Sequence, residues 1–137
     1  MFTITNPGES DITSAAKALI GGALVGIPTE TVYGLAADAE NEAAVARIYS
    51  VKGRPQNHPV IVHIGLVDYL NKWAINIPDY ALKLAKEYWP GPMTLVVKRS
   101  ELAKDFITGS QDTVGVRVPN HVVALALLEA FERAGGK

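Results

Sequence analysis

The chain alternates between two kinds of apolar pattern, and this alternation restricts its fold more than any other feature. Short runs rich in β-branched residues have the length and composition of strands. Between them lie longer segments whose apolar residues recur every three or four positions, as on one side of a helix. Val60–Ile64 shows the first pattern, and Ile12, Ala16 and Leu19 show the second. This order indicates an α/β protein, with right-handed crossovers between any parallel neighbours.

Helix start and stop signals set the expected boundaries. Ser10 or Asp11 is expected to cap the first helix, which Gly21 then ends, and Asn41 and Gly53 do the same for a second helix over 41–51. Similar signals predict a strand at 23–28, a loop at 54–59, strands at 60–64, 93–98 and 113–118, and helices at 78–88 and from 120 onward.

The composition excludes several classes of protein. The chain has 137 residues, which fits one domain, and 13 Lys and Arg against 14 Asp and Glu give a net charge of −1. This balance excludes a polybasic binder that acts through bulk charge, although a local basic patch stays open. The lack of Cys excludes a disulfide scaffold and a thiol nucleophile. Without a long apolar run or a secretory signal, we expect a cytoplasmic protein with no membrane partner.

The sequence has no GxxxxGK[ST], GxGxxG, HExxH or GxSxG motif, so the candidate site must come from other polar residues. In α/β proteins such residues lie after strands. The first cluster follows the strand at 23–28 and contains Thr29, Glu30, Thr31 and Tyr33. Its hydroxyl and carboxylate groups suit a small polar ligand, but they also fit a turn with a capping Thr and a core Tyr.

Three cationic positions and one histidine have both functional and structural interpretations. Lys52 and Arg54 flank Gly53 and could converge on a di- or triphosphate, although cations also stabilise a helix C-terminus. His63 lies on an apolar strand, where a histidine is more often part of the core. Arg117 also lies inside a strand and needs a carboxylate or a ligand anion, because burying an unpaired guanidinium is costly.

Four motifs occur in the order PTETVYGLA, KGRPQNHPVIVHI, WPGPMT and TVGVRVP. Together they resemble the YrdC-like threonylcarbamoyl-AMP synthase family, from about Gly22 to the last helix. The resemblance implies a twisted open mixed sheet with flanking helices and a concave, positively charged pocket. It also implies a nucleotidyltransferase that forms L-threonylcarbamoyl-AMP and pyrophosphate from L-threonine, bicarbonate and ATP. The product serves threonylcarbamoyladenosine modification of tRNA, through a downstream transferase complex.

The resemblance assigns roles to the matched positions. The threonine-binding residues would be Thr31, His63 and Arg117. The ATP-binding residues would be Lys52, Arg54, His58 and Thr113. Lys52 and Arg54 would also be catalytic, and Mg²⁺ would help pyrophosphate to leave without a dedicated metal-binding residue. Catalysis would consist mainly of positioning and electrostatic stabilisation.

The chain departs from the family pattern in one respect, and two alternative functions stay open. Family members continue into a strand and loop with a Ser-Ala-Asn motif, and this chain has no Ser-x-Asn. We therefore expect a single YrdC-like domain over residues 1–137, truncated on its C-terminal side. One alternative is an RNA-binding YrdC-like module without catalysis, with local contacts through Lys52, Arg54, Lys98 and Arg99. Another is a carbamoyl-transfer unit that uses carbamoyl phosphate, which the short chain disfavours. The KGRP and PGP-x-T motifs favour the synthase branch over the YciO-type branch.

Overall fold

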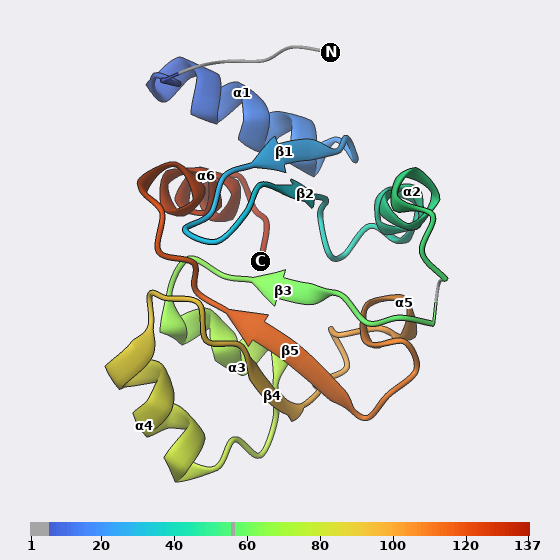
Figure 1. Ribbon diagram of the computed structural model, residues 1–137, viewed down its shortest axis with the longest axis vertical. Helices are drawn as coiled ribbons and strands as arrows, with labels where there is room; N and C mark the ends of the chain where they lie inside the picture. Colours follow the sequence, from blue (N-terminus) through green and yellow to red (C-terminus); the bar gives the residue numbers. More distant parts are fainter. Residues whose placement is uncertain (1–5, 56) are drawn as a thin grey trace.

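The computed structural model describes residues 6–55 and 57–137 and has the predicted mixed α/β architecture (Figure 1). The strands are β1 (Val25–Ile27), β2 (Gly34–Ala36), β3 (Ile61–His63), β4 (Leu95–Lys98) and β5 (Thr113–Arg117). The longer helices are α1 (Glu9–Ile20), α2 (Glu42–Lys52), α4 (Asp79–Tyr88) and α6 (Val122–Arg133). Single turns form η1 (Val67–Tyr69), α3 (Leu70–Trp73) and α5 (Asp105–Thr108).

In the described part of the chain the strands form two sheets. β1 and β2 make an antiparallel hairpin, and the second sheet has the order β3-β5-β4. β5 lies at its centre, parallel to β3 and antiparallel to β4, which makes this sheet mixed as expected. Residues alternate between the two faces of a strand. Val62, Val114, Val116, Leu95 and Val97 share the buried face and form part of the main core.

Two apolar clusters hold the layers of the molecule together. The main core lies beneath the β3-β5-β4 sheet and includes Leu70 and Trp73 of α3 and Ala85 of α4. The second core joins α1, β1 and α6, for example through Leu19 and Leu127. Figure 1 shows α1 and α6 beside the β1–β2 hairpin, with α3 and α4 at the other end of the molecule. The three-stranded sheet lies between them.

The capping prediction is confirmed for α2 and wrong for α1. The Asn41 side chain accepts a hydrogen bond of 3.0 Å from the Ala44 N–H, and Gly53 ends the helix with a φ of 64°. In α1 the N-cap is Gly8 rather than Ser10 or Asp11. The Asp11 carboxylate instead accepts the Gly8 N–H at 2.9 Å from inside the first turn. It therefore stabilises the same helix end from a different position.

The structure also corrects the expectations for two segments after β1 and in α6. The segment after β1 is not all loop, because Gly34–Ala36 returns as β2. Tyr33 is 84% exposed and is therefore not a core residue. In α6 the apolar side chains of Ala124, Leu127 and Phe131 are buried, and the charged Glu132 is partly buried as well. Its carboxylate accepts the Gly65 N–H at 2.9 Å and ties α6 to the end of β3.

Candidate active site

The face of the β3-β5-β4 sheet that lies opposite the core carries most of the candidate residues. Cross-strand pairing arranges this face in three rows. The rows are His63 with Arg117, Ile61 with Gly115 and Val96, and Thr113 with Lys98. We call these residues the open face. Its first row lies at the carboxyl ends of β3 and β5, and its last row lies at the amino end of β5. At about 3.3 Å per residue, Thr113 and Arg117 are about 13 Å apart along the strand.

Arg117 has the protein partner that its position requires. The Arg117 residue is only 7% exposed; its Nη2 donates to Oε1 of Glu30, and its Nε donates to the Gly91 carbonyl at 2.9 Å. The second Glu30 oxygen accepts the Asn120 N–H at 2.8 Å. Partial burial acts to raise the pKa of Glu30. The N–H groups of Asn120 and Glu30 and the Arg117 charge outweigh this effect, so the pKa is lowered.

His63 faces the same end of the open face. Burial is the main cause that lowers its pKa, and the positive charge of Arg117 acts in the same direction. The Ile61 carbonyl, 3.4 Å from Nδ1, and the Glu30 carboxylate oppose this shift but do not reverse it. The imidazole is therefore neutral at pH 7. If Nδ1 carries the proton toward Ile61, Nε2 is free to accept a hydrogen bond from a ligand.

Thr31 lies on the loop that joins β1 to β2, together with Glu30. The hydroxyl of Thr29 organises this loop: it donates to the Val32 carbonyl at 2.6 Å and accepts the Val32 N–H at 3.2 Å. Its oxygen is also 3.1 Å from the Thr31 hydroxyl. Thr29 therefore has the turn-capping role that the structural interpretation of this cluster described. Since Glu30 binds Arg117, this loop brings Thr31 to the end of the open face that holds His63 and Arg117.

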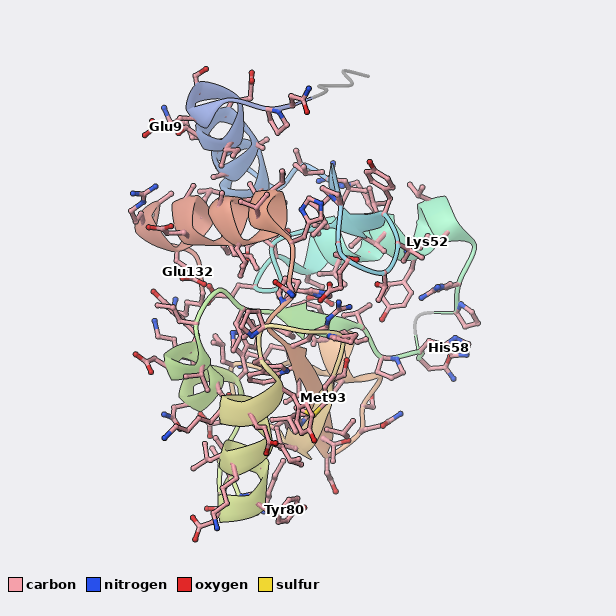
Figure 2. All side chains as sticks on the ribbon, turned by 60° about the vertical axis from the view of Figure 1, so that its left-hand side comes forward. Glu9, Lys52, His58, Tyr80, Met93 and Glu132 are labelled. Carbon is pink, nitrogen blue, oxygen red and sulfur yellow. The ribbon has the colours of Figure 1, made fainter. Side chains whose placement is uncertain are left out.

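Lys52, Arg54 and His58, which we call the basic loop, lie at the end of α2 and on the chain that leads to β3. Their side chains are exposed, and Figure 2 shows Lys52 and His58 on the same side of the molecule. Because this chain enters β3 at its amino end, the basic loop approaches the open face from the end that holds Thr113. The predicted threonine-binding and ATP-binding residues therefore approach opposite ends of one face.

The backbone of the basic loop is held by buried neighbours. The Tyr49 hydroxyl donates to the His58 carbonyl, with Phe106 O 3.4 Å away. Burial raises the pKa of Tyr49, although the Arg54 charge opposes this, so the hydroxyl keeps its proton. The Val60 N–H donates to the Ile107 carbonyl of α5 at 2.9 Å. Exposed cations on a fixed backbone are suited to binding an anion with little loss of entropy.

Sequence reasoning missed Glu30 as the partner of Arg117, and Val96 and Lys98 as members of the open face. The strand pattern could have revealed Val96 and Lys98, because they alternate with Leu95 and Val97, whose side chains are buried. Val96 is 67% exposed. The pairing of Glu30 with Arg117 had no local signal, since it spans 87 positions of the chain.

One of the four residues that the RNA-binding alternative named, Arg99, is engaged within the protein. Arg99 is not a free surface cation: its Nη1 donates to Asp105 at 2.7 Å and to the Thr108 hydroxyl at 2.9 Å. It therefore anchors α5 to the end of β4. Among the described residues, no three or more His, Cys, Asp or Glu side chains cluster as metal ligands. None of the helices in this part of the chain is long and apolar enough to cross a membrane.

The fold and the open face define an α/β protein whose sheet has a buried Arg and a His at one end of its open face and exposed basic side chains toward the other. The family model described as "Telomere recombination" (Sua5–YciO–YrdC) matches residues 17–134. The chain therefore belongs to the Sua5–YciO–YrdC family, as the sequence resemblance predicted.

The chain is similar to proteins named threonylcarbamoyl-AMP synthase. The relative from Pyrococcus abyssi is 50% identical over 125 residues, which cover 91% of this chain and 37% of the relative. The relative from Bacillus subtilis is 40% identical over 121 residues, which cover 88% of this chain and 35% of the relative. The chain thus spans little more than a third of these two relatives.

Solved structures share the fold. P. abyssi Sua5 complexed with L-threonine has a TM-score of 0.90 at 48% identity, over 93% of this chain and 38% of that one. Escherichia coli YciO has a TM-score of 0.82 at 26% identity, over 93% and 62%. These structures confirm the YrdC-like fold that the four motifs predicted.

Proposed function

We propose that the chain provides the substrate-binding face of an L-threonylcarbamoyladenylate synthase, a nucleotidyltransferase. The observation that carries this proposal is the arrangement of the open face, which has His63 and Arg117 at one end and the exposed side chains of the basic loop toward the other. The similarity to proteins named threonylcarbamoyl-AMP synthase supports the same activity.

L-Threonine would bind at the end formed by Thr31, His63 and Arg117. The Nη1 group of Arg117 makes no hydrogen bond to a described residue. This donor would bind the substrate carboxylate. The Thr31 hydroxyl and the neutral His63 imidazole would bind the hydroxyl and amino groups. The threonine complex of P. abyssi Sua5 supports a threonine site in this fold.

ATP would bind toward the other end, with its phosphates on Lys52, Arg54 and His58 and with Thr113 as a further contact. No carboxylate cluster lies among the described residues to hold a resident metal, so Mg²⁺ would arrive bound to the phosphates as part of the substrate. Lys52 and Arg54 would stabilise the negative charge that develops on the phosphates, which is the basis of their proposed catalytic role.

The reaction needs positioning more than it needs a nucleophilic side chain. The threonine amine forms a C–N bond with the carbon of bicarbonate and releases water, which gives a carbamate. An oxygen of this carbamate then attacks the α-phosphorus, and the bond to the β-phosphate oxygen breaks as pyrophosphate leaves. The open face would hold the carbamate in line with that bond, while the basic groups stabilise the departing pyrophosphate.

The test is release of pyrophosphate from MgATP, measured with and without L-threonine and bicarbonate. The proposal expects release that depends on both compounds, and release that is independent of threonine would contradict it. A longer chain that contains residues 1–137 serves as the comparison. The same proposal has three further parts. The product would pass to a downstream tRNA-modifying transferase complex, the chain would contact RNA weakly, and the protein would act in the cytoplasm.

A further inference from the structure

Glu30 links four segments of the chain at the proposed threonine end. It lies on the β1–β2 loop, binds Arg117 of β5 through one oxygen, and binds the Asn120 N–H before α6 through the other. Arg117 in turn binds the Gly91 carbonyl of the 89–92 segment. A single carboxylate therefore connects the loop that carries Thr31 with the strand that carries Arg117.

The arrangement leaves Arg117 with a restricted set of free donors. Nε and Nη2 are used within the protein, and Nη1 makes no hydrogen bond to a described residue. The guanidinium cannot turn without breaking its bonds to Glu30 or Gly91. The Arg117 side chain is 9% exposed and that of Glu30 is 22% exposed, so water reaches this pair mainly from the Glu30 side. The donor edge offered to a ligand is thus fixed before the ligand binds.

We propose that Glu30 is a positioning residue for substrate binding, because it fixes both the Arg117 guanidinium and the Thr31 loop in the arrangement that a small amino acid requires. This inference rests on the proposed function for the identity of the ligand, L-threonine. Glu30 does not touch the reacting atoms. It acts through Arg117 and through the backbone that carries Thr31.

Glu30→Gln is the most direct test, because it keeps the size of the side chain and removes its charge. An amide has one oxygen and cannot accept from Arg117 and Asn120 through two separate oxygens, so one of the two links must break. Glu87→Gln is the matched control, since Glu87 is exposed on α4 and is not one of the residues that bind Arg117.

The measurements are the KM for L-threonine, the KM for ATP, and the calorimetric affinity for L-threonine. Loss of a charge-assisted contact predicts a rise of about tenfold in the KM and Kd for threonine, with the KM for ATP changed less than about twofold. Unchanged threonine affinity overturns the inference. So does tighter binding, which would mean that Glu30 competes with the substrate carboxylate. An equal rise in both KM values also overturns it, because it would indicate a general structural defect.

Labelling of arginines with phenylglyoxal, mapped by mass spectrometry, gives a readout that does not depend on activity. Arg117 should react several-fold faster in Glu30→Gln than in the original protein, whereas the Glu87→Gln protein should not differ. If Arg117 reacts at the same rate in Glu30→Gln and in the original protein, the inference is overturned. If the original protein forms no product and binds no threonine, the proposed function fails, and the labelling still decides whether Glu30 holds Arg117.

Discussion

Arg117 combines a full positive charge with almost complete burial, and this combination defines the chemistry of its surroundings. A buried guanidinium is stable only with hydrogen-bonded partners, which Glu30 and Gly91 supply. From the sequence alone, either a protein carboxylate or a ligand anion could satisfy this charge. The structure gives the protein carboxylate, and the free Nη1 leaves room for a ligand as well.

Replacement of a cation at either end of the open face should lower turnover strongly. For Arg54→Ala and Arg117→Ala, loss of one charge-assisted contact should cost about 1.5 to 3 kcal/mol, or about 10- to 100-fold in kcat/KM. Arg54 is exposed, so Arg54→Ala should leave the unfolding temperature unchanged. Arg47→Ala, at an exposed position within α2, is the matched control. Normal kcat/KM in both site variants would contradict the assignments.

Arg117→Ala is also expected to reduce stability, in contrast to Arg54→Ala. Its removal leaves the Glu30 carboxylate without its buried partner, which typically costs several kcal/mol. The two variants therefore separate a contact made only with the ligand from one that also holds the fold. Thermal unfolding, recorded beside the kinetic measurements, distinguishes the two effects.

His63 should make the stability of the protein depend on pH in a defined range. Burial lowers its pKa in the folded state below the ordinary value of about 6.5, so the unfolded chain binds the proton more readily. The stabilisation is fully present above pH 6.5 and is lost as the pH falls through the lower, folded-state pKa. His63→Gln should flatten the slope of the unfolding free energy in this range, as measured by urea unfolding. An identical slope in both proteins would contradict the assigned pKa shift.

Helix α5 is short, but it supports the basic loop. Its residue Ile107 accepts the N–H of Val60, and Gly109, with a φ of 61°, lets the chain pass close to the Asn57 carbonyl. Arg99 holds α5 from the opposite side through Asp105 and Thr108. The chain at His58 and Val60 is therefore held by α2 through Tyr49 and by α5 through Ile107.

Tyr49→Phe should weaken ATP binding without affecting threonine. The change removes the hydroxyl that donates to the His58 carbonyl and leaves the ring in the core. We expect the KM for ATP to rise about three- to tenfold and the unfolding free energy to fall by about 1 kcal/mol. Tyr80→Phe on the exposed side of α4 serves as the control. A KM for ATP equal to that of the original protein would show that the hydroxyl does not position the basic loop.

The sequence predicted the four long helices and the strands β1, β3, β4 and β5, but it missed β2, α3 and α5. The predicted elements follow from apolar spacing, β-branched runs and capping residues, within a few positions at each end. β2, α3 and α5 have three or four residues each, too few to show a period, and β2 lacks the β-branched run that marks β3. They form because the main core and the hairpin supply contacts that no local pattern reveals.

The layers of the molecule are joined by polar contacts as well as by the two apolar cores. Glu30 joins the β1–β2 hairpin to β5, and Glu132 joins α6 to Gly65 after β3. Burial raises the pKa of Glu132, although the Gly65 N–H and the Lys72 charge oppose this. The sequence predicted several residues of the open face from their strands and loops. It could not predict which residues pair, because these contacts join distant parts of the chain.

The most direct test of the account is detection of threonylcarbamoyl-AMP by mass spectrometry. The protein is incubated with MgATP, L-threonine and ¹³C-bicarbonate, and omission of threonine is the control. The account predicts a threonine-dependent product that contains the labelled carbon, strongly reduced in Arg54→Ala and retained in Arg47→Ala. Absence of this product, both from this chain and from a longer chain that contains it, would contradict the account.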